Sequence, residues 1–263
     1  MAAALEKRAR DRNADAGSRM HMLDWVEGLA GPFRDSLNTL IAPTGAKLLP
    51  SAKWMPHSST EQGRREARLM VDDGFVSELR QSALRAWWLG SGDPRGNEPN
   101  WDLAATAVWP DGREGLVLVE AKAHVNELSE AGKEAPPKDA PRRQENHQSI
   151  GAAIKEAQAG LGGAAAGVKI SRDHHYQLSN RIAFAWKLAR LGTPVALVYL
   201  GFCGDSGMGP GCLRSESHWR EAFEAHAGRV LPPDMLEREI DCGMASFWVL
   251  VRARMAVRLS HDG

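Results

Sequence analysis

The sequence predicts an α/β protein with a mixed central sheet flanked by helices, and three observations predict this class. Apolar segments at 101–109 and 116–119 are joined by the turn signal Pro110-Asp111-Gly112, which is typical of a β-hairpin. Residues 176–191 form a strong helical pattern, and the buried strand predicted at 195–202 follows it. A helix between neighbouring strands makes a right-handed crossover, so this part of the sheet should be parallel.

The remaining elements are predicted from periodicity and caps. Residues 1–58 should form an N-terminal helical extension, and residues 59–263 one domain with an insertion at about 125–175. In the extension we expect a charged, frayed or helical segment at 1–20, an amphipathic helix at 20–41 and a Pro-rich loop at 42–58. In the domain, before the hairpin, we expect a helix at 58–82 and a short strand at 84–89. After the hairpin we expect a loop at 125–146, a helix at 147–159 before a flexible small-residue stretch, a helix around 219–226 and a strand at 245–251.

Composition excludes several classes of protein. The charged fraction of 25% and hydrophobic fraction of 43% are those of a soluble globular chain, and no apolar run is long enough for a membrane span. Three cysteines form neither a disulfide framework nor a C-x-x-C pair, and no signal peptide is evident, so a cytoplasmic location is expected. The net charge is zero, so a nucleic-acid partner would need a locally basic face.

The residues that carry chemistry lie on the predicted hairpin. Asp102 opens its first strand, and Glu120-Ala121-Lys122 ends its second, with Asp102 expected opposite residues 122–123. Glu120 and Lys122 are two apart, so they should share one face of the strand. Most strands that end in Glu-x-Lys carry only solvated edge charges. Here four apolar residues precede Glu120, and a second acid lies on the neighbouring strand, which favours a shared Mg²⁺ or Mn²⁺ ion.

The segments "PNWDL" and "GLVLVEAKAH" resemble the signature of PD-(D/E)xK, restriction-endonuclease-like nucleases, over roughly residues 60–202. The resemblance implies a core of helix, three strands, helix and strand (αβββαβ). It also implies that Asp102 and Glu120 bind Mg²⁺ or Mn²⁺ and that Lys122 activates or positions water. Pro99 lies three residues before Asp102 rather than beside it, so it is uninformative. The 125–175 insertion departs from the pattern and obscures the substrate class.

Many members of this superfamily add a glutamate from the first core helix, which here points to Glu66. The length of the predicted strand at 84–89 places the metal end of that helix near residue 69, closer to Glu66 than to Glu61 or Glu78. The alternative is that Glu66 pairs with a neighbouring arginine on a solvated face.

The helix after the insertion should begin beside the metal, because it follows the active-site end of the sheet. Gln177, Asn180 and Arg181 lie in its first turns and are candidates for binding substrate phosphate or ordering a metal-bound water. Tyr176 and Asn180 could instead only cap the helix. The pair His174-His175 is expected to be a solvated loop pair rather than a metal site.

Two other patterns favour structure over binding. Five tryptophans fall in predicted core elements, where burial explains them better than base stacking does; they are Trp87, Trp88, Trp101, Trp109 and Trp186. The tail carries Arg252, Arg254 and Arg258 in alternation with apolar residues. This alternation predicts a solvated strand face, with a phosphate-facing edge as the alternative.

Together the sequence and the resemblance predict a metal-dependent nuclease, with DNA favoured over RNA by superfamily precedent only; a homodimer is left open. One alternative is an inactive protein of the same fold that acts as a nucleic-acid-binding or assembly subunit. Another is an unrelated α/β enzyme. The chain has no G-x-G-x-x-G or G-K-[ST] after a strand and no G-x-S-x-G, which disfavours Rossmann, P-loop and α/β-hydrolase enzymes.

Overall fold

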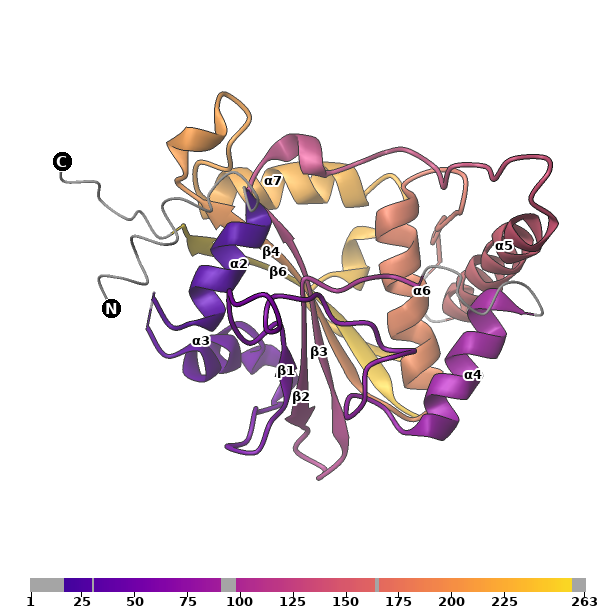
Figure 1. Ribbon diagram of the computed structural model, residues 1–263, viewed down its shortest axis with the longest axis horizontal. Coiled ribbons are helices and arrows are strands. Elements are labelled where there is room, and N and C mark those ends of the chain that lie inside the picture. Colours follow the sequence, from indigo (N-terminus) through magenta and orange to yellow (C-terminus); the bar gives the residue numbers. More distant parts are fainter. Residues whose placement is uncertain (1–16, 30, 91–97, 164–165, 257–263) are drawn as a thin grey trace.

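The computed structural model describes residues 17–29, 31–90, 98–163 and 166–256. Within these residues a six-stranded mixed sheet has the order β1-β2-β3-β4-β6-β5, and helices cover both of its faces (Figure 1). The α/β class with a mixed, helix-flanked sheet is therefore confirmed. The strands are β1 (Trp54–Met55), β2 (Leu103–Val108), β3 (Glu114–Lys122), β4 (Val195–Cys203), β5 (Glu239–Asp241) and β6 (Ser246–Met255).

The predicted hairpin is formed by β2 and β3, which pair antiparallel. Its turn is tight because Gly112 adopts a left-handed φ of 83° and its N–H donates to the Trp109 carbonyl. Leu103 pairs with Val119, so Asp102 lies level with Glu120. The expectation that Asp102 faces residues 122–123 was therefore wrong by two positions. Strand pairing continues to Glu114, which shortens the turn assumed from the sequence.

The predicted crossover is also confirmed. α6 (Tyr176–Arg190) connects the two parallel strands β3 and β4, and β4 in turn pairs in parallel with β6. β3 and β4 are buried along nearly their whole length. This burial agrees with a parallel strand pair that lies between two layers of helices.

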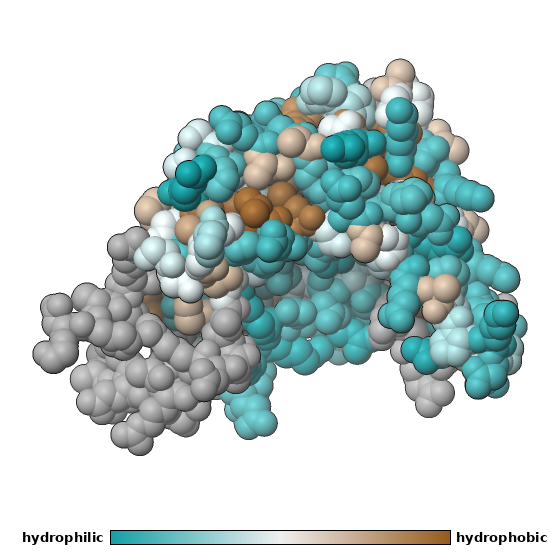
Figure 2. Space-filling model, turned by 90° about the horizontal axis from the view of Figure 1, so that it is seen from above, coloured by the Kyte–Doolittle hydropathy of each residue, from teal (hydrophilic) through white to brown (hydrophobic). Residues whose placement is uncertain are grey.

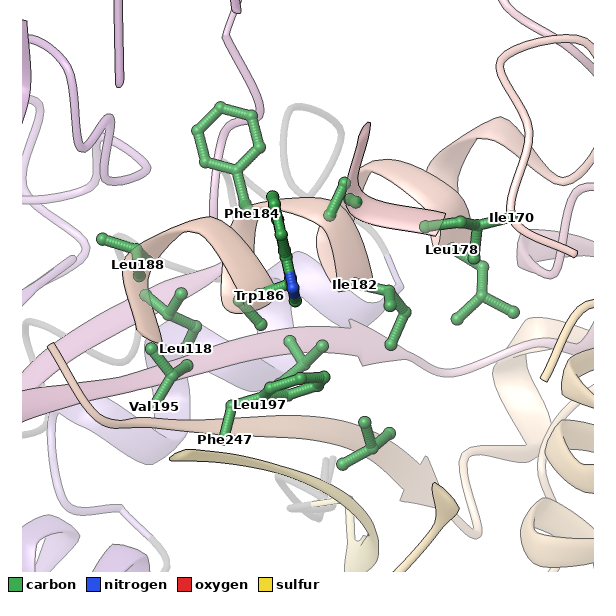
Figure 3. Close-up of a cluster of buried hydrophobic side chains, with 14 of the residues drawn as sticks. Leu118, Ile170, Leu178, Ile182, Phe184, Trp186, Leu188, Val195, Leu197 and Phe247 are labelled. Atoms are coloured by element: carbon green, nitrogen blue, oxygen red, sulfur yellow. The ribbon is translucent and has the colours of Figure 1, made fainter. Parts of the chain in front are cut away.

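Two separate cores sit on the two faces of the sheet. α2 (Ser18–Val26) and α3 (Phe33–Leu40) pack on one face, where Trp25 and Leu37 meet alternate residues of the central strands. The helices α4 (Glu78–Leu89), α5 (Pro141–Gly162), α6 and α7 (Glu216–Ala227) contribute to the core of the other face. Figure 3 shows α6 side chains such as Ile182 and Leu178 lying over Leu118, Leu197 and Phe247 of the sheet.

The helix expected at 20–41 is two helices. α2 ends at Val26 and α3 begins at Phe33, because Gly28 and Gly31 adopt left-handed φ values of 75° and 97° and Pro32 follows them. Both helices pack on the sheet that β1 also joins, so the described part of 17–58 shares the core of the rest of the chain. β1 itself falls in the segment 42–58, which the sequence predicted to be only a loop.

The helix expected at 58–82 and the strand expected at 84–89 were both wrong. Residues 58–77 form turns and one bridge, Ala67 to Trp101, and the helix α4 occupies 78–89 instead. Leu84, Trp88 and Leu89 are buried with helical spacing. A short apolar run does not distinguish a buried helix from a strand, and here tertiary packing selects the helix.

The region expected as an insertion contains more helix than predicted. α5 spans 141–162 rather than 147–159, because Pro141 is tolerated in its first turn and Gly160 to Gly162 continue it. Gly160 is required there for close packing, since a Cβ would lie 2.4 Å from a ring carbon of Trp186. A short 3₁₀ turn, η2 (Val125–Glu127), follows β3 directly, within the segment 125–146 expected to be a loop. Residues 164–165 of the small-residue stretch lie outside the described residues.

The C-terminal predictions are confirmed with longer bounds. α7 and β6 cover the helix and strand expected around 219–226 and 245–251. Arg252 donates to the Leu40 carbonyl and pairs with Glu237, and Arg254 stacks over Trp25 at 4.7 Å. Both arginines therefore make contacts within the chain rather than forming a solvated or phosphate-facing face, and Arg258 lies outside the described residues. In the described part of the chain, no helix has the length and apolar character that crossing a bilayer requires.

Candidate active site

Alternation along β3 aims Glu120 and Lys122 at the face that α6 covers. Leu116 and Leu118 belong to the core under α6, whereas Val117 and Val119 belong to the core under α2. The predicted shared face is confirmed, because Lys122 Nζ donates to Glu120 Oε1 at 2.6 Å. Both side chains are buried, with 6% and 3% of their surfaces exposed.

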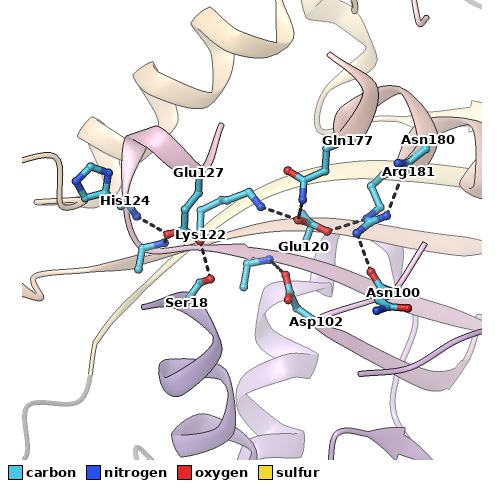
Figure 4. Close-up of polar contacts among 12 residues, drawn as sticks. Ser18, Asn100, Asp102, Glu120, Lys122, His124, Glu127, Gln177, Asn180 and Arg181 are labelled. Carbon is cyan, nitrogen blue, oxygen red and sulfur yellow. Dashed lines mark hydrogen bonds and ion pairs between the residues drawn. The ribbon is translucent and has the colours of Figure 1, made fainter. Parts of the chain in front are cut away.

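Asp102 reaches the same place from the start of β2. Its Oδ2 accepts a hydrogen bond from the Ala121 backbone N–H at 2.7 Å (Figure 4). Asp102 and Glu120 line one cavity of about 460 Å³. Its walls are formed by Glu66, Arg68, Glu98, Asn100, Asp102, Glu120, Gln177 and Arg181. The structure thus brings Asp102 and Glu120 to one cavity, and Lys122 joins them through its bond to Glu120 although it is not among the lining residues.

Glu120 is held by three charged or polar donors, as Figure 4 shows. Lys122 Nζ and Gln177 Nε2 donate to Oε1 at 2.6 and 2.7 Å, and Arg181 Nε donates to Oε2 at 2.7 Å. Burial alone would raise the pKa of Glu120, but the charges of Arg181 and Lys122 outweigh it and lower that pKa. Glu120 is therefore an ionised carboxylate at neutral pH.

Asp102 behaves in the opposite way. Burial is the largest cause, and the neighbouring negative charge of Glu120 adds to it, so the pKa of Asp102 is raised to about 7. Lys122 and the Ala121 N–H oppose this rise only in part. Two adjacent carboxyl groups with pKa values pushed apart are typical of functional sites, and a cation bound between them would relieve their repulsion.

Two of the three α6 residues predicted to lie beside the site contact Glu120. Gln177 and Arg181 line the cavity, and Arg181 also donates to the Asn100 carbonyl at 2.7 Å and stacks on Trp101. Asn180 is not among the lining residues; its side chain accepts from Arg181 at 2.8 Å and so orients that guanidinium. All three predicted positions thus fall in one network, with Asn180 in a supporting place.

Glu66 lines the cavity although the helix on which it was placed does not form. It lies in the turn-rich segment before the Ala67 bridge to Trp101, which carries it to the start of β2. Arg19 of α2 pairs with it at 2.6 Å, with 28% of each side chain exposed. Glu66 thus pairs with an arginine, as the alternative expected, and it also lines the cavity, while its role at a metal stays a prediction.

Sequence reasoning missed Glu98 and Glu127. Glu98 lies in a stretch before Asp102 that is dense in Gly, Pro and Asn, and its carboxylate is buried, accepts from the Met70 N–H at 2.6 Å and lines the cavity. Burial raises the pKa of Glu98 to about 7. Glu127 accepts from the Ala123 and His124 N–H groups and from Ser18, which fixes the turn after β3. The only signal for Glu98 in the sequence was its position four residues before Asp102.

The expectation that His174 and His175 form a solvated pair was wrong for His175. Its side chain is buried, its φ is 46°, and its ring lies 4.8 Å from that of His226 on α7. The predicted burial of the tryptophans is confirmed for Trp88, Trp101, Trp109 and Trp186, and Trp87 is packed against the core while partly exposed.

The donor set fits a hard divalent cation with few protein ligands. Glu120 Oε2 has one donor, so it keeps a lone pair, and the structure shows no hydrogen bond to Asp102 Oδ1 among the described residues. Within the described ranges no three His, Cys, Asp or Glu side chains are grouped to hold a metal. Mg²⁺ commonly takes only one or two carboxylates and completes its shell with water and phosphate, so Asp102 and Glu120 suffice.

Comparisons with known proteins add no assignment to this geometry. No family model, curated protein or solved structure matches the chain. The candidate site therefore rests on the residues of the cavity themselves.

Proposed function

We propose that the protein is a metal-dependent nuclease that hydrolyses phosphodiester bonds in nucleic acid, with DNA favoured as substrate. The observation that carries the proposal is the convergence of Asp102 and Glu120 on one cavity while Lys122 bonds Glu120. This convergence is what the PD-(D/E)xK resemblance requires of the three residues. The order of the helices and strands also supports the proposal.

The order of elements can be aligned with the αβββαβ core that the resemblance implies. β1, β2 and β3 are successive antiparallel neighbours, and β4 lies parallel beside β3 after the α6 crossover. α2 and α3 supply the preceding helical layer on the opposite face from α6. On this alignment α4 and α5 are additions to the core, placed before β2 and after β3.

Each residue has a chemical role in the proposed reaction. Asp102 and Glu120 would hold Mg²⁺ or Mn²⁺, which when bound polarises the phosphate and lowers the pKa of water. Lys122 would orient the attacking water and offset the negative charge of the pentacoordinate transition state. Gln177 and Arg181 fix the Glu120 carboxylate, and Arg181 keeps it ionised while it is buried.

The test is cleavage of labelled single- and double-stranded DNA and RNA with Mg²⁺, Mn²⁺ or EDTA. Cleavage with either metal, its loss in EDTA and its loss in Glu120→Gln and Lys122→Ala are expected. Glu114→Gln is the matched control, because Glu114 is an exposed glutamate at the other end of the same strand. Full cleavage by both purified site variants would end the proposal.

A second function is favoured by one observation, the three donors already bound to Glu120. A carboxylate so occupied would also suit an inactive nuclease-fold protein that binds nucleic acid or assembles with a partner. Calorimetric Mn²⁺ binding that disappears in Asp102→Asn would argue against this alternative. Nucleic-acid binding without any metal binding would favour it.

A further inference from the structure

A group of four cationic or imidazole side chains lies beside α6, within the segment 125–175. We name Lys133, Arg143, His147 and Arg172 the insertion cluster. The Lys133 N–H donates to the Arg172 carbonyl at 2.8 Å, and the Arg172 guanidinium donates to the His147 carbonyl at 3.2 Å. Arg143 and His147 are one turn apart on α5, so they share a face of that helix. Three chain segments thus converge on one place.

The packing of α5 keeps Arg172 in this position. Its guanidinium lies over Gly151, where a Cβ would come within 3.0 Å of the Arg172 Nη1 atom. Gly151 follows His147 by one helical turn, so Arg143, His147 and Gly151 form a single stripe beneath Arg172. The stripe leaves space for the arginine and presents no acidic side chain to it.

Two acids compensate part of the positive charge of the cluster: Asp173 pairs with Arg172, and Glu134 acts on Lys133. Burial and then the charge of Arg143 lower the pKa of Lys133, and burial followed by Arg172 and Lys133 lowers that of His147. Asp173 pairs with Arg172, but 61% of its side chain is exposed. His147 Nδ1 is buried and has no hydrogen-bond partner among the described residues. An anion bound here would offset the mutual repulsion of these groups.

The cluster contacts the first turn of α6, the turn that also supplies Gln177 to the proposed active site. Lys133 Nζ lies over the ring of Tyr176, 4.9 Å from its centre. The next residue, Gln177, donates to Glu120. Figure 2 shows that the face seen from above is mostly hydrophilic, with some hydrophobic residues gathered near its middle.

We propose that the insertion cluster binds a backbone phosphate of the nucleic-acid strand whose scissile bond lies at Asp102 and Glu120. This inference rests on the proposed nuclease function and assigns a role to the segment 125–175. Lys133 and Arg143 supply point charge to the phosphate, Arg172 supplies guanidinium N–H donors, and His147 supplies a ring nitrogen. Such contacts position a strand without reading its sequence.

The test measures binding of a labelled oligonucleotide, single-stranded and duplex, in EDTA at several salt concentrations. The variant is Lys133→Gln with Arg143→Gln. The control is Arg34→Gln with Lys47→Gln, which removes the same charge from two residues outside the segment 125–175, and thermal melting confirms that both variants are folded. The cluster variant should bind about tenfold more weakly at low salt. Its slope of log K against log salt should be smaller by about one, because the cluster neutralises one phosphate.

Each outcome decides the proposal. A salt slope equal to that of the wild type overturns it, as does an equal loss in the control variant. Inorganic pyrophosphate serves as competitor; if the cluster variant loses only pyrophosphate binding and keeps the oligonucleotide slope, the site takes free phosphate and the proposal fails. Because binding is measured without metal, the result is separate from cleavage. If the slope changes as expected but the protein never cleaves nucleic acid, the nuclease proposal fails and phosphate binding by the insertion cluster stands.

Discussion

Asp102 Oδ2 accepts a hydrogen bond from the backbone N–H of Ala121 at 2.7 Å, so the acid of one strand is tied to the residue that separates Glu120 from Lys122 on the next. The Ala121 side chain points into the core under α2, and its backbone N–H, which lies in the plane of the sheet, points to the start of β2 and fixes Asp102 there. The two carboxylates are thus positioned by the hairpin itself.

Glu120→Ala should destabilise the fold more than Glu120→Gln. The alanine variant leaves Arg181 and Lys122 buried without their acid, at 8% and 6% side-chain exposure. Removing one partner from a buried ion pair costs about 3–5 kcal/mol, whereas glutamine retains an acceptor for one of the donors. Urea unfolding at pH 7 measures the difference. Equal stability of the two variants would show that the charged groups of Arg181 and Lys122 are solvated, which would contradict their burial beside Glu120.

Asp102→Asn should stabilise the protein at pH 8 and have little effect near pH 4. The folded pKa of Asp102, about 7 against 3.8, means that the native state holds a proton that the unfolded chain has lost. The contribution of Asp102 to the free energy of unfolding is therefore largest below about pH 4, and it is lost as the pH rises towards 7. The gain at pH 8 should be on the order of 4 kcal/mol. Unfolding curves at both pH values, with Asp35→Asn as surface control, test the sign; a loss of stability at pH 8 would contradict it.

Divalent-cation affinity should increase with pH until about pH 7 and then level off. The proton on Asp102 competes with the cation for the same oxygens, and burial beside Glu120 raises its pKa to about 7. Below that pH the affinity should change about tenfold per pH unit. Mn²⁺ titrations between pH 5.5 and 8.5 measure this dependence. An affinity that is constant over the range would place the bound ion elsewhere.

Arg181→Met should destabilise the protein strongly, whereas Arg190→Met on the same helix should not. Arg181 is buried against Glu120, Asn100 and Trp101, so its loss leaves a buried carboxylate with weaker compensation, at a cost of about 3–5 kcal/mol. Arg190 makes one hydrogen bond, to the Cys242 carbonyl, worth about 1 kcal/mol. Thermal or urea unfolding of the pair compares them. Similar costs would mean that the Arg181 network adds nothing beyond a single hydrogen bond.

The sequence predicted the parts of the fold that depend on local pattern and chain direction. The hairpin followed from Pro110-Asp111-Gly112 between apolar runs, and the crossover followed from a strong helix before a buried strand at 195–202. These features place Glu120, Lys122 and the first turn of α6 together. For that reason Asp102, Gln177 and Arg181 were found from the sequence alone.

The elements that it missed are decided by tertiary contacts. Residues 84–89 are apolar and short, and their helical state depends on packing against α5 and α6, which no local signal records. Glu66 reached the cavity through the bridge between Ala67 and Trp101, not through a helix. Glu98 was hidden in a stretch with turn composition, because burial of a carboxylate in a loop has no periodic pattern.

The most direct test of the account is calorimetric titration of Mn²⁺ into the wild type, Asp102→Asn, Glu120→Gln and the control Glu114→Gln. One binding site in the wild type and in Glu114→Gln, with its loss in both Asp102→Asn and Glu120→Gln, is the predicted result. Unchanged Mn²⁺ binding in the two site variants, or no binding in the folded wild type, would contradict the claim that these carboxylates share a cation.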